Sequence, residues 1–180
     1  MKAIQDLFLK AKHWHIFVVL VAIPYAIGFM TIGAKQKVFY LGVPLAMTFV
    51  FGVTLLAWYR SVASFSLSRF KPQYQMNQRF FKVAMLSPLL WVPIAYWLTH
   101  DMGEWANAVM IPLHLVAMGC MFYILNFVSK SLVMAETGNP TSPPDYLGTL
   151  LMFWMFPIGV WFVQPRVNRL YDRSLRLSAQ

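Results

Sequence analysis

Histidine and methionine side chains recur along one stretch of the sequence at the spacing of a single helix face. Met110, His114, Met118 and Met121 stand at positions i, i+4, i+8 and i+11 within residues 105–135, so a helix would place them in one stripe. An imidazole with thioethers beside it is a ligand set that suits haem iron or Cu(I). The stripe is therefore the candidate cofactor-binding site of the chain.

The same stripe also has a structural interpretation, which we favour. Methionine fills irregular gaps in packed cores, and the 12 Met are spread over the whole sequence. A buried imidazole needs a hydrogen-bond acceptor, which a carbonyl freed by proline or the hydroxyl of Thr54 or Ser87 could supply. On this interpretation His114 is a structural side chain, Cys120 is an inert buried thiol, and neither haem nor copper is bound.

Two further groups of residues have ligand chemistry but poor spacing. His13 and His15 are two residues apart, so a helix points them to different sides, and we interpret them as anchors at the membrane interface. His100, Asp101 and Glu104 crowd into one short turn, which is more typical of a polar loop than of a metal site. We predict no catalytic residues and no metal-binding cluster.

The elements that must position these residues are set by the composition. Hydrophobic residues make up 59% of the chain and charged residues 12%, about half the charged share of a soluble domain. Lipid must therefore surround most of the 180 residues, and we expect one transmembrane domain spanning residues 1–180. The net charge of +9 comes from cations at segment ends, where anionic lipids attract them, so we predict no binding of nucleic acid.

The sequence predicts an all-α polytopic transmembrane bundle built on five apolar segments. They span residues 15–34, 38–59, 83–99, 105–135 and 146–163. Each segment contains proline, which removes a backbone donor and frees a carbonyl that neighbouring helices must satisfy. We therefore expect kinked helices packed against one another. Either all five segments cross the membrane, or four cross and one is re-entrant.

Charge patterning favours the re-entrant alternative. Residues 60–82 form a polar connection with five Lys or Arg and no acid, which is typical of the cytoplasmic side, and its serines are expected to be solvated. If segment 146–163 turns back at Pro157–Gly159, every Lys and Arg except Lys35 and Lys37 falls on that side. A re-entrant segment 83–99 gives a similar but weaker bias. Both alternatives place the N-terminus in the cytoplasm.

The sequence predicts an amphipathic helix at the membrane surface for each end of the chain. In residues 1–14, Ile4, Leu7, Phe8 and Ala11 share one helical face. In residues 164–177, one apolar face is flanked by arginines, as in a cationic interfacial helix; that face holds Val167, Leu170, Tyr171 and Leu175.

Three stretches resemble a family of small multi-pass proteins of the bacterial inner membrane for which no activity is established. They are LKAKHWHIF at residues 9–17, IPLHLVAMGCMFYILNFVSKSL at 111–132 and DYLGTLLMFWMFPIGVWFVQPRVNRL at 145–170. The resemblance implies a multi-pass fold in a bacterial plasma membrane. It implies no substrate and no functional residues.

The chemical groups present in the sequence allow three functional hypotheses to be ranked. No acidic or basic residue stands at mid-depth of a segment, where proton-coupled transporters and pumps place them. We therefore expect a non-enzymatic accessory or scaffold subunit with protein partners in the lipid bilayer. The first alternative is a haem- or copper-binding redox subunit that uses His114 and the neighbouring Met residues. The second is a small transporter or channel for a neutral or lipid-like solute.

Overall fold

In the computed structural model, which describes residues 2–31, 37–69, 76–101 and 106–178, the described chain is helical between short turns. Three helical stretches are long and apolar enough to cross a membrane: Ala46–Leu67, Gln78–Leu98 and Ala108–Thr137. A fourth candidate span results if two helical stretches that meet at a 112° bend are taken as one; they are Ala3–Lys10 and His13–Phe29.

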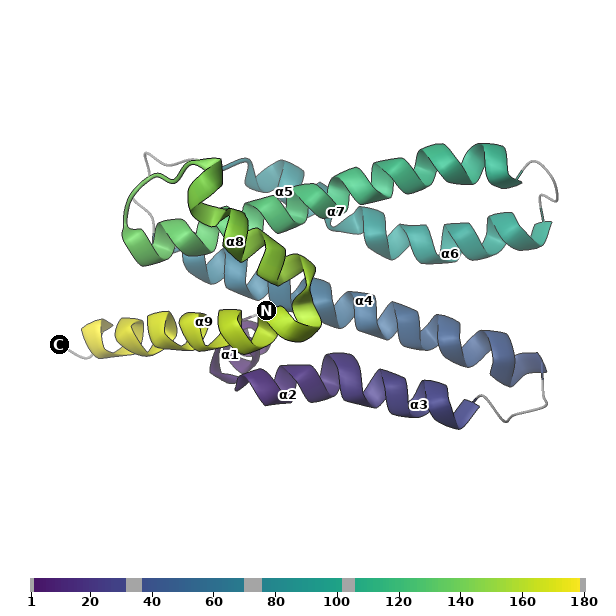
Figure 1. Ribbon diagram of the computed structural model, residues 1–180, viewed down its shortest axis with the longest axis horizontal. Helices are drawn as coiled ribbons and strands as arrows, with labels where there is room; N and C mark the ends of the chain where they lie inside the picture. The colour runs from purple at the N-terminus through teal and green to yellow at the C-terminus, as the bar shows by residue number, and fades with distance from the viewer. Residues whose placement is uncertain (1, 32–36, 70–75, 102–105, 179–180) are drawn as a thin grey trace.

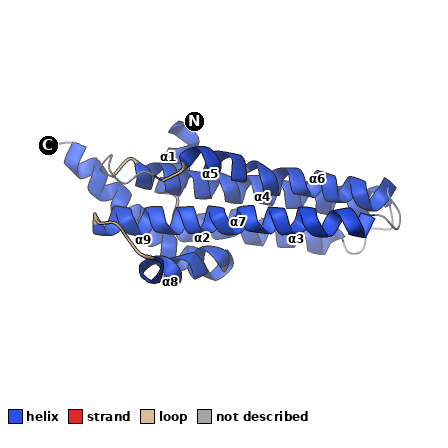
Figure 2. Cartoon of the chain, turned by 90° about the horizontal axis from the view of Figure 1, so that it is seen from above, coloured by secondary structure: helices blue, strands red, loops and turns tan. Residues whose placement is uncertain are grey.

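Two long helices, α4 (Lys37–Leu67) and α7 (Ala106–Thr137), form the frame of the molecule (Figure 1). Beside α4 run α2 (His13–Phe17), the π-helical turn η1 (Val18–Ala22) and α3 (Ile23–Thr31). Beside α7 run α5 (Gln78–Ala84) and α6 (Leu86–Asp101). Figure 2 shows these helices lying nearly parallel in a shallow layer.

The remaining helices gather at one end of this frame. Helix α1 (Lys2–Lys10) packs across α4, while α8 (Pro143–Trp154) and α9 (Phe156–Ser178) form a hairpin that enters and leaves at that same end (Figure 1). We call this end the packed half: α1, α8, α9 and residues 55–67, 78–85 and 124–134. The open half comprises α3, α6 and residues 46–54 and 108–118.

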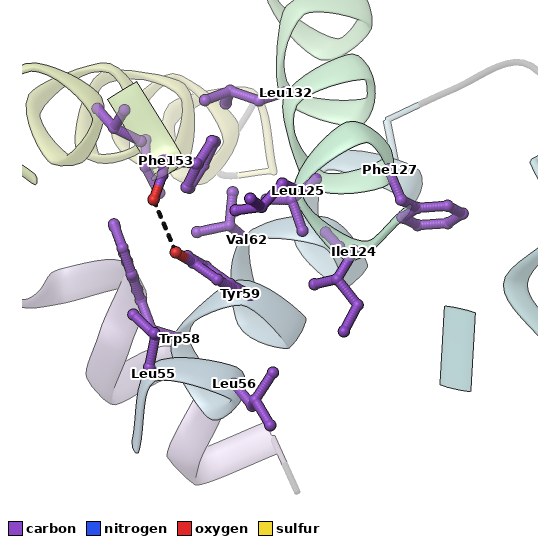
Figure 3. Close-up of a cluster of buried hydrophobic side chains, with 14 of the residues drawn as sticks. Leu55, Leu56, Trp58, Tyr59, Val62, Ile124, Leu125, Phe127, Leu132 and Phe153 are labelled. Atoms are coloured by element: carbon purple, nitrogen blue, oxygen red, sulfur yellow. Dashed lines mark hydrogen bonds between the residues drawn. The ribbon is translucent and has the colours of Figure 1, made fainter. Parts of the chain in front are cut away.

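The hydrophobic core lies almost wholly in the packed half. Trp58 and Tyr59 of α4 are fully buried in one cluster with Ile124 of α7 and Phe153 of α8 (Figure 3). The rings of Trp58, Tyr59 and Phe153 lie within 5.5 Å of one another. The close packing of these large side chains joins three helices in one core.

Proline and glycine shape the α8–α9 hairpin. Pro157 has no N–H to donate to the carbonyl of Phe153 four residues earlier, and the hydroxyl of Tyr59 donates to that oxygen instead, at 2.8 Å (Figure 3). Gly159 lies so close to the backbone carbonyl of Met152 that a Cβ atom would collide with it. The expectation that a neighbouring helix satisfies a proline-freed carbonyl is confirmed here.

Helix α9 also holds the C-terminal end of α1, where carbonyls have no partner within their own helix. Gln164, fully buried, donates to the carbonyls of Phe8 at 2.8 Å and Ala11 at 2.9 Å. Its own carbonyl oxygen accepts from the Trp58 indole N–H at 3.0 Å. Asn168 donates to the carbonyl of Leu9 at 2.7 Å. These bonds fix the sharp bend after α1.

The prediction of five crossings is wrong, because residues 146–163 do not form one helix. They divide between α8 and α9 around Met155, and neither helix qualifies as a span. The re-entrant alternative for this segment matches the hairpin. The other alternative, a re-entrant 83–99, stays a prediction; these residues lie almost wholly in the candidate span Gln78–Leu98.

The polar connection predicted for residues 60–82 is shorter than expected. Helix α4 continues to Leu67 and α5 begins at Gln78. Ser61 and Ser66, predicted to be solvated, are buried because this last part of α4 packs inside the packed half. The hydroxyl of Ser61 donates to the carbonyl of Ala57 at 2.7 Å, so burial leaves it satisfied.

Both terminal amphipathic helices pack differently from the prediction. In α1, Leu9 is buried while Ile4 and Leu7 are 59% and 65% exposed, because the helix meets α4 and α9 through Leu9. The arginine-bearing tail is no separate helix but the continuation of α9. Its Val167 and Tyr171 are buried in the protein core rather than laid on lipid.

Candidate functional site

The histidine–methionine stripe lies on α7 at the boundary between the two halves. Three of its four members, His114, Met118 and Met121, line the same apolar hollow between α4, α6 and α7. Met110 is not among the residues that line it. The structure therefore brings together three of the predicted site residues, in the order in which the helix presents them.

His114 is a polar side chain in an apolar setting. Its ring lies 5.1 Å from that of Trp91 on α6, and the ring planes are tilted by 53°. Among the described residues it has no hydrogen-bond partner. The hydroxyl of Thr54, an expected acceptor, instead donates to the carbonyl of Val50 at 2.8 Å. The predicted hydrogen bond of His114 therefore stays a prediction.

The hollow beside His114 has a volume of about 280 Å³. Its wall is apolar except for Thr48 and His114, and it includes Gly52. A second hollow of about 270 Å³ shares Phe51, Leu55, Met118 and Met121 with the first. The two hollows therefore border the same residues of α4 and α7, and we call them together the lateral groove.

The α8–α9 hairpin borders the second hollow. Trp154 of α8 and Phe156 of α9, on either side of the hairpin turn, line the second hollow together with Tyr59. The ring of Phe156 lies 5.3 Å from that of Phe51 on α4. The first hollow thus lies beside His114 and the second beside the hairpin turn, and each volume approaches the range of small-molecule sites.

The other predicted ligand groups do not converge in the described chain. His13 packs on Trp161 with ring centroids 4.5 Å apart, whereas His15 lies against Trp14 and accepts from the Lys12 backbone N–H at 3.1 Å. Cys120 is half-buried against the core. The turn at residues 100–104 lies outside the residues whose side chains are described. Within the described residues, no three His, Cys, Asp or Glu side chains could share a metal ion.

Haem or copper at the stripe stays a prediction. The thioethers of Met118 and Met121 line the hollow that His114 lines, which fits a mixed nitrogen and sulfur donor set. Met110 falls outside that arrangement.

Sequence reasoning missed a charged cluster in the packed half. The guanidinium of Arg166 on α9 binds both carboxylate oxygens of Glu136 at the end of α7, with Nε donating to Oε1 at 2.8 Å. Its Nη1 donates to the hydroxyl of Thr149 on α8 at 3.0 Å. One arginine therefore joins three helices. The sequence signal for this cluster was Arg166, which stands close to the end of the apolar segment 146–163.

A second carboxylate fixes the start of α8. The Ser142 hydroxyl donates to Asp145 at 2.8 Å and the Ser142 backbone N–H donates to it at 2.7 Å. These two bonds, the backbone one first, lower the pKa of Asp145 below its usual value. Pro143 and Pro144 occupy the first turn of α8, where a missing N–H is tolerated.

Comparison of the chain with protein-family models, with curated proteins and with solved structures finds no match. The function must therefore be argued from the groove, the packed half and the exposed helix faces.

Proposed function

We propose that this protein is a non-enzymatic accessory or scaffold subunit of a larger membrane complex. The observation that carries the proposal is the poor internal packing of its longest apolar span. Only 17% of the most apolar window of Ala108–Thr137 is buried within the protein, and 22% for Gln78–Leu98. The helices of the packed half contact one another closely. The open half contains two long helices, most of whose surface has no contact within the protein.

The exposed face of α7 suits contact with other transmembrane helices. Ile111, Leu115 and Val116 are each more than 60% exposed. Helices associate in lipid through close packing and interhelical hydrogen bonds. His114 adds a polar group beside this face, and ionisable residues within spans usually face protein or a cavity rather than hydrocarbon.

The charge distribution supports an orientation with the packed half at the cytoplasmic surface of a bacterial plasma membrane. Arg169, Arg173 and Arg176 lie on α9, Arg69 lies in the turn after α4, and Arg79 and Lys82 lie on α5. Anionic lipid and the positive-inside rule favour cations there. Both the chain start and the end of α9 then face the cytoplasm. The bacterial origin rests on the family resemblance.

Site-specific photo-crosslinking in intact membranes tests the proposed subunit role. A photoreactive residue replaces Leu115, 62% exposed on α7, and in a matched control it replaces Tyr25, 78% exposed on α3. We expect Leu115 to yield a discrete adduct with another protein and Tyr25 to yield chiefly lipid adducts. Lipid adducts alone at Leu115, together with a monomeric particle in mild detergent, would contradict the proposal.

A redox subunit that binds haem or copper is the second candidate, supported by the shared hollow of His114, Met118 and Met121. A visible spectrum and elemental analysis of the purified protein decide it. An absorbance band or stoichiometric copper that is lost in His114→Leu supports this candidate, and the absence of both from the wild type rejects it.

A further inference from the structure

Going beyond a scaffold role, we propose that a polar cleft between α1, α9 and the end of α4 binds the zwitterionic head group of phosphatidylethanolamine. The cleft has a volume of about 470 Å³, which falls within the range of small-molecule sites. We call it the terminal cleft. Its wall combines two opposite charges, polar groups that can accept hydrogen bonds, and an apolar rim.

The two opposite charges belong to Asp6 of α1 and Arg69 in the turn after α4, both of which line the cleft. Both side chains are described, and no ion pair joins them. The Arg69 guanidinium instead lies over the Phe65 ring, 5.2 Å from its centroid. A guanidinium binds phosphate through paired hydrogen bonds, and a carboxylate accepts from an ammonium group. Two separate charges of opposite sign therefore match a ligand that carries both.

The groups around Asp6 favour a primary ammonium. The Tyr171 hydroxyl donates to one oxygen of Asp6 at 3.3 Å, and among the described residues the other oxygen has no partner. The Ser174 hydroxyl, in a residue 7% exposed, donates to the Tyr171 carbonyl at 2.6 Å, and its oxygen can still accept. Ethanolamine carries N–H donors for these acceptors and choline carries none. The wall is therefore suited to ethanolamine rather than choline.

The rim of the terminal cleft is apolar. Leu175 and Leu177 of α9 line it and are 48% and 65% exposed. A soluble phosphoethanolamine ester leaves these side chains uncovered, whereas the glycerol and acyl parts of a phospholipid cover them. Covering apolar surface is favourable in proportion to its area. The rim is the reason for assigning the cleft to a lipid.

An anionic phospholipid is the competing occupant, because the chain carries a net charge of +9. Arg173 and Arg176 of α9 attract any phosphate, but neither lines the terminal cleft. Asp6 does line it, and its carboxylate repels a head group that carries only negative charge. We therefore expect phosphatidylglycerol to bind the exposed arginines, with an affinity that falls as salt is added.

The test is native mass spectrometry of the purified full chain in mild detergent, titrated separately with phosphatidylethanolamine, phosphatidylcholine and phosphatidylglycerol of the same acyl composition. The first phosphatidylethanolamine should bind about tenfold more tightly than the first phosphatidylcholine. Asp6→Asn retains an acceptor for Tyr171 and should abolish that preference. Arg69→Gln should weaken the binding of both lipids about fivefold, because both carry the phosphate.

Two matched control variants make the same charge changes outside the cleft. Asp172→Asn and Arg173→Gln alter exposed residues of α9 that do not line it, and each should change the Kd for phosphatidylethanolamine less than about twofold. Equal effects of the cleft and control substitutions would overturn the proposal. Equal affinity of the wild type for phosphatidylethanolamine and phosphatidylcholine would overturn it as well.

Soluble phosphoethanolamine separates the whole lipid from its head group alone. We expect it to displace the lipid only at a concentration at least about tenfold higher, because it covers neither Leu175 nor Leu177. Displacement at equal concentration would reject the lipid as occupant in favour of a soluble ester. None of these results bears on the photo-crosslinking test at Leu115, so the two proposals fail separately.

Discussion

The two halves of α7 have opposite surroundings. In the packed half, Ile124, Val128 and Leu132 are fully buried between α4, α5 and α8. In the open half, Ile111 and Leu115 are 63% and 62% exposed. In lipid, an apolar side chain is equally stable against a neighbouring helix or an acyl chain, so hydrophobicity alone does not decide which it contacts.

Polar groups make the difference between the halves. The packed half holds Gln164, Asn168 and the Arg166–Glu136 pair, each of which joins helices far apart in sequence. In the open half, His114 has a ring contact and no hydrogen bond among the described residues. The comparison teaches that directional bonds, rather than apolar area, determine which part of this protein has a single fixed arrangement.

The largest expected effect comes from Gln164→Leu in the packed half. It leaves the Trp58 N–H and the carbonyl of Phe8 without their partner, while the carbonyl of Ala11 keeps its bond from Asn168, and each buried orphan group costs roughly 1–3 kcal/mol. We expect a loss of about 3 kcal/mol in the free energy of unfolding, measured by denaturant titration in detergent. His114→Leu, the matched polar-to-apolar change in the open half, should alter it by less than about 0.5 kcal/mol. Equal losses of unfolding free energy in the two variants would contradict the distinction between the packed half and the open half.

The next effect tests the close approach in the hairpin. Gly159→Ala places a methyl group against the Met152 carbonyl and should cost about 2 kcal/mol, as overpacking of a core does. Gly148→Ala on α8 meets no atom within 4 Å and should be neutral or stabilising by up to about 1 kcal/mol. Thermal unfolding of both variants checks the contrast, and a stable Gly159→Ala would mean that α8 and α9 do not meet as described.

A smaller effect is expected at the charged cluster. Arg166 and Glu136 side chains remain 22% and 24% exposed, so solvent screens their attraction. A double-mutant cycle with Arg166→Gln and Glu136→Gln should give a coupling free energy of about 1 kcal/mol. Additive losses, with no coupling, would show that the pair does not hold α7 to α9.

The smallest effect is the pH dependence of the α8 cap. Because the Asp145 pKa is lowered in the folded protein, its contribution to stability is complete above the usual carboxyl range and is lost as the pH falls through the lowered value. The melting temperature of Asp145→Asn should therefore lie below that of the wild type at neutral pH, and the gap should close on acidification. A gap that stays constant with pH would contradict the cap.

Much of the helical architecture could be predicted from sequence. The end of α7 is an example: Gly138 adopts φ +70°, and its N–H bonds to the carbonyl of Met134 at 2.9 Å, which only a residue such as glycine does without strain. The break near Pro157 and the helical segment 105–135 were also anticipated, because prolines and long apolar runs act locally.

What sequence could not supply were contacts between distant segments. Gln164 reads as an ordinary polar residue after an apolar run, and only the return of α9 past α1 turns it into a buried partner for Trp58 and Phe8. Ser66 likewise reads as solvated until the end of α4 is enclosed. For the stripe, periodicity placed His114, Met118 and Met121 together, but the groove depends on α4 and α6.

The measurement that tests the account most directly is the membrane side of the two ends of the packed half. In a Cys120→Ala background, Lys10→Cys and Leu177→Cys are labelled with a membrane-impermeant maleimide in right-side-out and inverted vesicles. The hairpin predicts that both cysteines react from the same face, the cytoplasmic one. Labelling of the two cysteines from opposite faces would show that residues 146–163 cross the membrane and would contradict the hairpin on which the packed half and the groove depend.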